Sequence, residues 1–278
     1  MRFAIAIPTD ATSWKLVRRA EELGFHRAWF YDTQMLSADP FVAMAAAGWF
    51  DALSLAREYA GRREVFAAAL VRHVALVAGS IAPALLIGVP LGLLALRRRR
   101  FETPLFVTLN LLQTVPSIAL FGLLIVPLSA LASAVPALGT LGVGGVGPAP
   151  AIIALTIYAL LPIARNTLVG IGGVSPATLD AGRGMGMTPR QLFWRVEVPL
   201  ALPVLLAGLR IVLVQTIGLA VVAALIGAGG LGSFVFQGIG QGATDLVLLG
   251  AIPTIGLALI ADFALRVAAD LLRRRVAR

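Results

Sequence analysis

The chain has 278 residues, of which 59% are hydrophobic and 13% are charged, and its formal net charge is +9. A soluble globular domain carries about twice that charged fraction, so the composition indicates an integral membrane protein. The apolar stretches are too long for barrel strands, which favours transmembrane helices. The sequence has no cysteine and two histidines, which excludes disulfides, thiolate metal sites and a histidine metal cluster.

Residues 1–47 differ in character from the rest of the chain. Arg2–Pro8 and Phe25–Tyr31 are typical of short buried strands, and a helix is expected between them over residues 12–23. A β-α-β unit of this kind cannot bury its apolar faces alone. We therefore predict a partial, non-functional segment that arose by fusion, by rearrangement or from a misassigned start, with a genuine soluble cap as the weaker alternative.

Residues 48–65 are amphipathic, which fits either a helix at the membrane surface or an ordinary linker helix. Residues 66–278 are predicted to form one all-α transmembrane domain. Its apolar runs are each near the ~20 residues that cross a bilayer core. The five predicted spans are about Val74–Leu96, Leu105–Leu128, Ala149–Val169, Leu205–Ile226 and Leu246–Leu265.

The distribution of arginine predicts the orientation of these spans. The loops 129–147 and 227–244 contain no lysine or arginine, whereas Arg97–Arg100, the loop 173–199 and the carboxyl terminus are basic. By the positive-inside rule the basic side is cytoplasmic. Arginines between residues 57 and 72 oppose this orientation, and a native protein that begins near residues 44–49 would reduce the conflict.

The spans lack the chemistry of a self-powered transporter. The only lysine is Lys15, and no Gly-x-x-x-x-Gly-Lys-Ser/Thr loop for ATP is present. Asp262 is expected to pair with Arg266 one helical turn further on, with a proton-relay role as the alternative. An energy source outside the chain is therefore favoured, and a proton- or ion-coupled secondary transporter is the competing interpretation. We expect no catalytic residue, no metal site and no nucleic-acid partner.

Polar residues inside the spans are candidates for a translocation path. Polar groups in lipid are costly, so these side chains are expected to face the bundle interior or a cavity. Hydrogen bonds between helices are the alternative for each residue. The path is favoured for Gln113–Ser117, because Pro116 frees backbone carbonyls there. The candidates are Asn110, Gln113, Thr114, Ser117, Tyr158, Gln215 and Thr216.

The loop 173–199 is the main candidate for a partner contact. Gly182 and Gly186 are four residues apart and are expected to leave one helical face without side chains, so that another backbone can approach. Met185 and Met187 add adaptable apolar surface. Docking into a groove of a partner is the favoured interpretation, and packing on the chain's own bundle is the alternative.

The same loop resembles the cytoplasmic signature of the inner-membrane permeases of ABC importers. That signature is Glu-Ala-Ala, three residues, Gly, nine residues and Ile-x-Leu-Pro, and the matched positions here are Asp180, Ala181, Gly182, Gly186 and Val196–Pro199. Asp, Gly and Val replace the usual Glu, Ala and Ile or Leu. The resemblance implies the type I importer fold and a coupling helix that contacts the ATPase. The implied coupling residues are Asp180, Ala181, Gly182, Gly186, Met187 and Pro199.

The resemblance covers about residues 65–278 and is greatest to the osmoprotectant branch, whose solutes include glycine betaine, choline and carnitine. The supporting stretches are Asn110–Leu120, Tyr158–Thr167 and Ala223–Gly232; the last is also similar to methionine permeases, so an amino acid is an alternative solute. The implied partners are a pair of ATP-binding subunits, a second permease copy or homologue, and a separate substrate-binding protein. ATP and Mg²⁺ would bind the ATPase, with no cofactor on this chain.

Residues 1–47 resemble the start of the luciferase-like flavin or deazaflavin oxidoreductases, which are TIM barrels. The rest of such a barrel, roughly 200 residues, is absent from the sequence. A membrane-anchored oxidoreductase is therefore the weaker rival, and binding of flavin or deazaflavin is expected to be absent.

Overall fold

The computed structural model describes residues 3–8, 25–31, 52–140 and 142–276, and the chain divides into two compact units, residues 1–61 and 62–278. In the first unit, β1 (Phe3–Pro8) pairs in parallel with β2 (Phe25–Tyr31). Both predicted strands are therefore present. The helix predicted over residues 12–23 lies outside the described residues.

The first long helix, α3 (Ala52–Arg97), includes most of the predicted amphipathic segment and the whole first span. Its backbone leaves helical geometry at Arg62, where φ is −126° and ψ is 15°. Pro83 and Pro90 lie within the helix without ending it. Transmembrane helices tolerate proline because neighbouring groups can satisfy the freed carbonyls.

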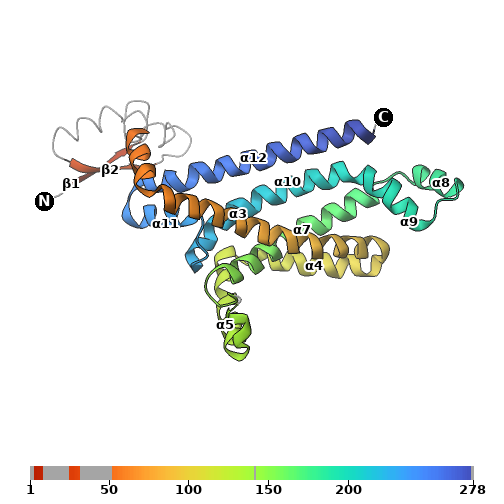
Figure 1. The fold of residues 1–278 in the computed structure, drawn as a ribbon, viewed down its shortest axis with the longest axis horizontal. Coiled ribbons are helices and arrows are strands. Elements are labelled where there is room, and N and C mark those ends of the chain that lie inside the picture. Colours follow the sequence, from red (N-terminus) through yellow and green to blue (C-terminus); the bar gives the residue numbers. More distant parts are fainter. Residues whose placement is uncertain (1–2, 9–24, 32–51, 141, 277–278) are drawn as a thin grey trace. The chain divides into compact units, whose positions relative to one another are not determined.

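Every secondary-structure element among the described residues of the second unit is a helix (Figure 1). Long helices alternate with short ones, a π-helical turn (η1) and a 3-10 turn (η2). After α3 the elements are α4 (Arg99–Thr114), α5 (Ser117–Ala134), α6 (Pro136–Thr140), α7 (Pro148–Gly172), α8 (Pro176–Gly184), α9 (Pro189–Leu192), η1 (Phe193–Glu197), α10 (Val198–Val222), η2 (Ala223–Ile226), α11 (Gly232–Gln241) and α12 (Thr244–Val276).

Five segments of the described chain are long and apolar enough to cross a membrane, which confirms the predicted number. They are Arg57–Arg97, Ser117–Ala134, Pro148–Gly172, Pro189–Ile226 and Thr244–Leu272. The prediction of one unbroken span over residues 105–128 was wrong. The helix is interrupted between α4 and α5, where Val115 has an extended backbone with φ −67° and ψ 125°. Proline at 116 causes the break, because it disfavours helical geometry in the residue before it.

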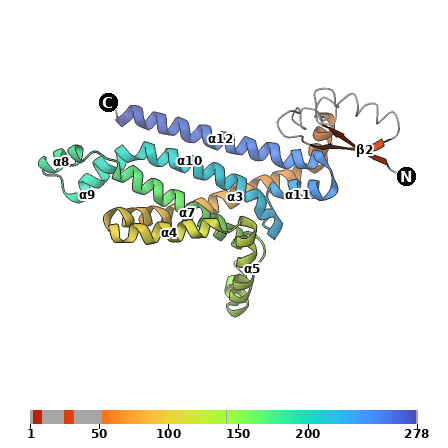
Figure 2. The ribbon, with the colours of Figure 1, turned by 180° about the vertical axis from the view of Figure 1, so that it is seen from behind.

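Helix α7 lies at the centre of the packing in the second unit. On one side α3 approaches it closely: a side chain at Gly92 would meet the Ala164 carbonyl oxygen at 2.5 Å, and one at Gly88 would meet Ile163 at 2.8 Å. Helix α10 lies along α7 and α12, and the two ribbon views agree on this order (Figures 1 and 2). Small residues at such contacts let helices approach in an environment where hydrophobic driving force is weak.

The glycine-rich turn, residues 227–232, connects η2 to α11 and packs on α3. The Arg72 guanidinium donates through Nε to the Ala228 carbonyl at 3.1 Å. His73 is fully buried, and its Nε2 lies 3.1 Å from the Ile217 carbonyl of α10. Gly230 has φ +83° and faces the His73 ring, where a Cβ would lie 3.1 Å from Nδ1. Only glycine meets both the backbone and the space requirement here without strain.

Candidate functional site

The loop 173–199 folds into two short helices at the end of the bundle opposite the glycine-rich turn (Figures 1 and 2). Helix α8 begins with Pro176, whose fixed φ suits the first helical turn. Asp180 and Arg183 form an exposed ion pair on α8, with Oδ1 and Nη1 2.7 Å apart. Exposed pairs of this kind stabilise a helix by only about 0.3–0.5 kcal/mol, so α8 depends on its packing.

The expectation that Gly182 and Gly186 share one bare helical face was wrong. Helix α8 ends at Gly184, and Gly186 adopts a left-handed backbone with φ +78°. Gly182 is buried against the chain itself, since a Cβ there would meet Leu192 at 2.6 Å. The two glycines therefore have different structural roles: Gly182 lets α9 pack on α8, and Gly186 turns the chain between them.

Helix α9 is held by local hydrogen bonds that the sequence encodes. The Thr188 hydroxyl accepts from the Gln191 amide at 3.3 Å, and the Gln191 side chain accepts from the Thr188 amide at 2.9 Å. This reciprocal capping box satisfies two N–H groups at the start of the helix. The π-helical turn η1 then leads into α10, and Pro199 stands in the first turn of α10. Helices α9, η1 and α10 thus form one continuous stretch of helix.

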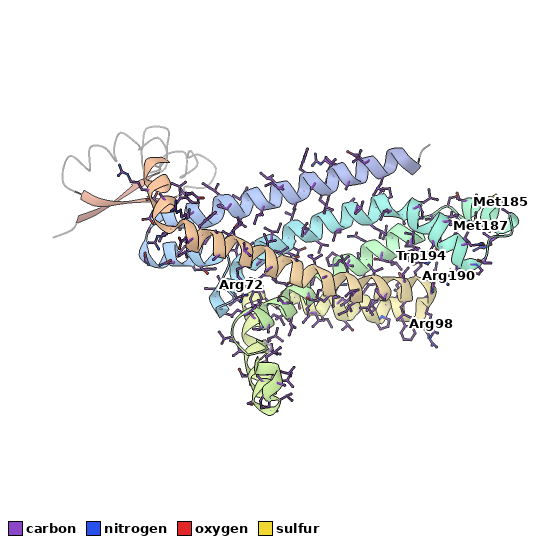
Figure 3. All side chains as sticks on the ribbon, in the orientation of Figure 1. Arg72, Arg98, Met185, Met187, Arg190 and Trp194 are labelled. Carbon is purple, nitrogen blue, oxygen red and sulfur yellow. The ribbon has the colours of Figure 1, made fainter. Side chains whose placement is uncertain are left out.

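The predicted coupling residues divide into an exposed group and a supporting group. Asp180, Ala181 and Gly186 are exposed, as is Met185, whose side chain is 71% exposed. Gly182 is buried, and Met187 and Pro199 are half-buried. Figure 3 shows Met185 and Met187 at the end of the loop. The exposed group can touch a partner, and the supporting group fixes its position.

Behind these helices lies a cleft of about 1080 Å³, called here the arginine cleft. The last turns of α3 and α7 form one wall, and α8, α9 and η1 form the other. Its apolar floor includes Leu96, Ile171 and Leu192, and its charged lining residues are Arg97, Arg183, Arg190 and Glu197. The Arg97 guanidinium stacks on the Phe193 ring at 5.6 Å from the centroid.

Among the candidates for a translocation path, the structure brings Gln113 and Tyr158 together. Gln113 Nε2 donates to the Tyr158 carbonyl at 2.8 Å, and the Tyr158 hydroxyl donates to the carbonyl of Val115. This pair of bonds joins α7 to the break between α4 and α5. The carbonyl that the break leaves without a helical donor therefore has a partner inside the bundle.

The other path candidates are not joined to this pair. Thr114 and Thr216 donate to carbonyls of their own helices, at Leu111 and Val212. The side chains of Asn110 and Gln215 are exposed, and Ser117 is half-buried. Thr216 is 3% exposed, so its hydroxyl contributes to packing within the bundle.

Asp262 carries two ion pairs. The predicted pair with Arg266 is confirmed, with Oδ2 and Nη2 3.2 Å apart along α12. A second pair, which we did not predict, joins Asp262 Oδ1 to Nε of Arg210 on α10 at 2.9 Å. Asp262 and Arg210 are each about a third exposed. The carboxylate therefore links two membrane-crossing helices and balances an arginine within the apolar run of α10.

No group of three histidine, aspartate or glutamate side chains in the described part of the chain comes together as metal ligands. Sequence reasoning did not single out Arg210 or His73, and it did not group Arg97 with Arg190. Arg210 carried a usable signal, because an arginine inside an apolar run needs a partner. His73 and Arg190 carried none, since their neighbours come from distant parts of the chain.

The fold and the loop define the class of protein. Residues 84–278 match the family described as "Binding-protein-dependent transport system inner membrane component", and the chain belongs to this family. It is a multi-pass membrane permease component of an ABC importer. The resemblance of the loop to the permease signature agrees with this assignment.

Several relatives are similar over the same region. The chain is 41% identical to the osmoprotectant import permease protein OsmW of Salmonella typhimurium, covering 70% of this chain and 85% of the relative. It is 42% identical to the carnitine transport permease protein OpuCB of Listeria monocytogenes, covering 70% and 82%. It is 38% identical to the choline transport system permease protein OpuBB of Bacillus subtilis, covering 70% and 83%.

Solved structures confirm the type I permease fold. An inward-facing structure of the MetNI methionine ABC transporter has a TM-score of 0.62 at 24% identity, covering 76% of this chain and 98% of that chain. The structure of an amino acid ABC transporter has a TM-score of 0.58 at 18% identity, covering 81% and 98%. At these identities the likeness concerns the fold alone.

Proposed function

We propose that this chain is the permease subunit of an ATP-driven importer for small osmoprotectants such as glycine betaine, choline and carnitine. The observation that carries the proposal is the 38–42% identity to permeases named for osmoprotectants, carnitine and choline. The identity extends over more than four fifths of each of those relatives. A quaternary ammonium solute is the shared chemistry of the named substrates.

The loop 173–199 is the proposed contact with the ATP-binding subunit. Asp180, Ala181 and Gly186 would meet that subunit, and Gly182 and Met187 would hold their backbone in place. A push on α8 reaches α10 through α9 and η1, with Pro199 in the first turn of the long helix. Closure of the ATPase pair would thereby switch the permease between inward and outward access.

The remaining parts of the importer are proposed as separate chains. ATP and Mg²⁺ bind the ATPase pair, and this chain hydrolyses nothing and binds no cofactor. A second permease copy or homologue completes the path, and a substrate-binding protein delivers the solute. The arginine distribution supports a cytoplasmic loop 173–199 and a cytoplasmic carboxyl terminus in a bacterial inner membrane.

The proposed translocation path includes the polar side chains Asn110, Gln113, Thr114, Ser117, Tyr158, Gln215 and Thr216. Within this set Gln113 and Tyr158 contribute to the path indirectly, since their hydrogen bonds connect α7 to the interruption between α4 and α5. The exposed Asn110 and Gln215 are free to face a cavity formed with a second permease copy.

The test is uptake by the reconstituted complex. The chain is placed in proteoliposomes with its ATP-binding and substrate-binding subunits, and uptake of radiolabelled glycine betaine is measured with and without internal ATP. We expect ATP-dependent uptake that unlabelled choline or carnitine inhibits and methionine does not. Uptake that persists without ATP and stops with an uncoupler would instead indicate a secondary transporter, and inhibition by methionine alone would indicate an amino acid permease.

A further inference from the structure

The arginine cleft lies where two candidate membrane-crossing helices end. Its walls include the last residues of two spans, Arg97 at the end of α3 and Gly172 at the end of α7. Lipid headgroups occupy this level of a bilayer. At this level a lipid headgroup is available to the side chains that line the cleft.

The lining of the cleft has the two-part chemistry of a phospholipid. Leu93, Leu96 and Ile171 form an apolar floor on the last turns of α3 and α7. Arg97 and Arg190 supply guanidinium groups beside this floor. Arginine binds phosphate through paired N–H donors, and an acyl chain would cover the apolar floor.

The charge balance of the cleft favours an acidic lipid. Among the described residues, Arg183 already pairs with Asp180, whereas no ion pair of Arg97 or Arg190 occurs. The Arg97 guanidinium carbon lies over the Phe193 ring, 5.6 Å from the centroid, which is a cation–π contact. Glu197 is the one carboxylate that lines the cleft. Two arginines therefore lack an anionic partner next to an apolar surface.

Trp194 adds a third feature of a lipid contact. It lines the cleft, is 61% exposed and meets Phe193 edge to face at 5.2 Å between centroids. Tryptophan is enriched at the level of lipid headgroups, where its ring is both apolar and polar. Figure 3 shows Trp194 and Arg190, which both line the cleft, at the same end of the helices as Arg98.

We propose that the arginine cleft is a binding site for an acidic phospholipid, with the phosphate on Arg97 and Arg190 and one acyl chain on the apolar floor. A soluble phosphate compound would leave the floor uncovered. A volume of about 1080 Å³ exceeds the ~300–1,000 Å³ of typical small-molecule sites and accommodates a headgroup with the upper part of a chain. The bound lipid would join the loop 173–199 to α3.

The test uses the fluorescence of Trp194 in the full-length chain. The other tryptophans, Trp14, Trp29 and Trp49, are replaced by phenylalanine, so that Trp194 is the only emitter. The protein is placed in phosphatidylcholine nanodiscs that contain phosphatidylglycerol, with bromine on the acyl chains of either lipid in separate samples. Bromine quenches tryptophan on contact. We expect brominated phosphatidylglycerol to quench Trp194 well beyond its molar share, and brominated phosphatidylcholine not to.

Two double variants with the same loss of charge separate a site from general attraction. R97Q/R190Q removes the two cleft arginines, and R98Q/R195Q removes two arginines outside the cleft lining. We expect apparent affinity for phosphatidylglycerol to fall at least about tenfold in the first and to change little in the second. Arg190→Gln alone, at an exposed position, replaces the first variant if the double change prevents folding.

Four outcomes would overturn the proposal. Equal quenching by both lipids would show that the cleft has no preference for an acidic headgroup. Equal loss of affinity in the two double variants would show that general surface charge, and not the cleft, attracts the acidic lipid. Displacement by soluble glycerol phosphate would indicate a site for a soluble anion. Normal lipid quenching in R97Q/R190Q, with loss of binding to the ATP-binding subunit, would assign the cleft to a protein partner.

Discussion

Two connections between membrane helices lie at opposite ends of the second unit and are built in opposite ways. The glycine-rich turn 227–232 is covered by α3, and long-range hydrogen bonds from Arg72 and His73 hold it in place. The loop 173–199 is exposed along α8 and depends on short-range bonds such as those between Thr188 and Gln191.

The difference indicates which connection contributes mainly to the stability of the fold and which has a surface that a partner can contact. A turn that is mostly buried by its own chain offers little surface to a partner. A loop with its own helices, a left-handed glycine and exposed methionine has a defined shape and a free surface. Substitutions in the turn should therefore reduce folding, and substitutions in the loop should reduce transport by a folded protein.

The largest effect is expected for Gly232→Val in the glycine-rich turn. A Cβ at this position would overlap the Val221 carbonyl oxygen and lie 2.9 Å from Ala224. Since backbone atoms cannot move aside cheaply, the cost should reach about 3 kcal/mol or more. Recovery of monodisperse protein in detergent measures the effect. Gly240→Val in the same helix, with open space around it, is the control and should fold normally.

Gly186→Leu should abolish ATP-driven uptake while membrane insertion is retained. The position has φ +78° and open space, so the folding cost is limited to about 1–2 kcal/mol of backbone strain. The added side chain would block the surface next to α8. Uptake in proteoliposomes and the amount of inserted protein are measured together.

The matched control for this change is Gly242→Leu. Gly242 also has a positive φ, +64°, and open space, but it follows α11 near the other end of the unit. Uptake by this variant should be close to that of the unchanged protein. Normal uptake by Gly186→Leu, or equal losses in both variants, would contradict a docking role for the loop.

Asp262→Asn should destabilise the contact between α10 and α12 by about 2 kcal/mol. The change leaves Arg210 inside the span without its carboxylate partner. Because both side chains are about a third exposed, the loss of stability stays below the ~3–5 kcal/mol expected for a fully buried pair. Unfolding in mixed micelles measures the effect. Arg266→Gln, at a 60% exposed position, should cost only about 0.5 kcal/mol. Equal costs for the two changes would show that the interhelical bond is unimportant.

Thr188→Ala should have the smallest and most local effect. It removes the hydroxyl that caps α9 and should cost about 1 kcal/mol of local stability. Hydrogen exchange of residues 185–192 should become faster, with no change in α12. Thr188→Ser keeps the cap and should restore slow exchange. If exchange is unchanged in the alanine variant, packing of Leu192 alone is sufficient to hold α9.

The local sequence predicted the number of spans correctly, but it was not used to predict the interruption near Pro116. Five apolar runs predicted five membrane-crossing segments, because length and composition decide whether a helix can cross a bilayer. The same reasoning extended the second span across Val115, where the chain is extended. Proline at 116 was enough to predict that the helix ends there. The hydrogen bond that Tyr158 donates to the Val115 carbonyl could not be predicted, because it comes from a distant helix.

In the candidate site, too, local sequence predicted some features, and others depend on contacts in the folded chain. The spacing from Asp180 to Pro199 could be matched to the permease signature from the sequence alone, because the signature lies within one short segment. The placement of Gly182 against Leu192 was not, since it depends on where α8 ends and how α9 turns back. The roles of these residues in coupling stay predictions.

The sequence by itself determined the membrane class, the five spans, the resemblance to ABC permeases and the intrahelical pair of Asp262 with Arg266. These depend on composition or on residues within one or two helical turns. Tertiary structure alone decided the bond between Arg210 and Asp262, the burial of His73 under the glycine-rich turn and the grouping of Arg97 with Arg190. These contacts join residues more than 50 positions apart, and their register depends on how complete helices pack.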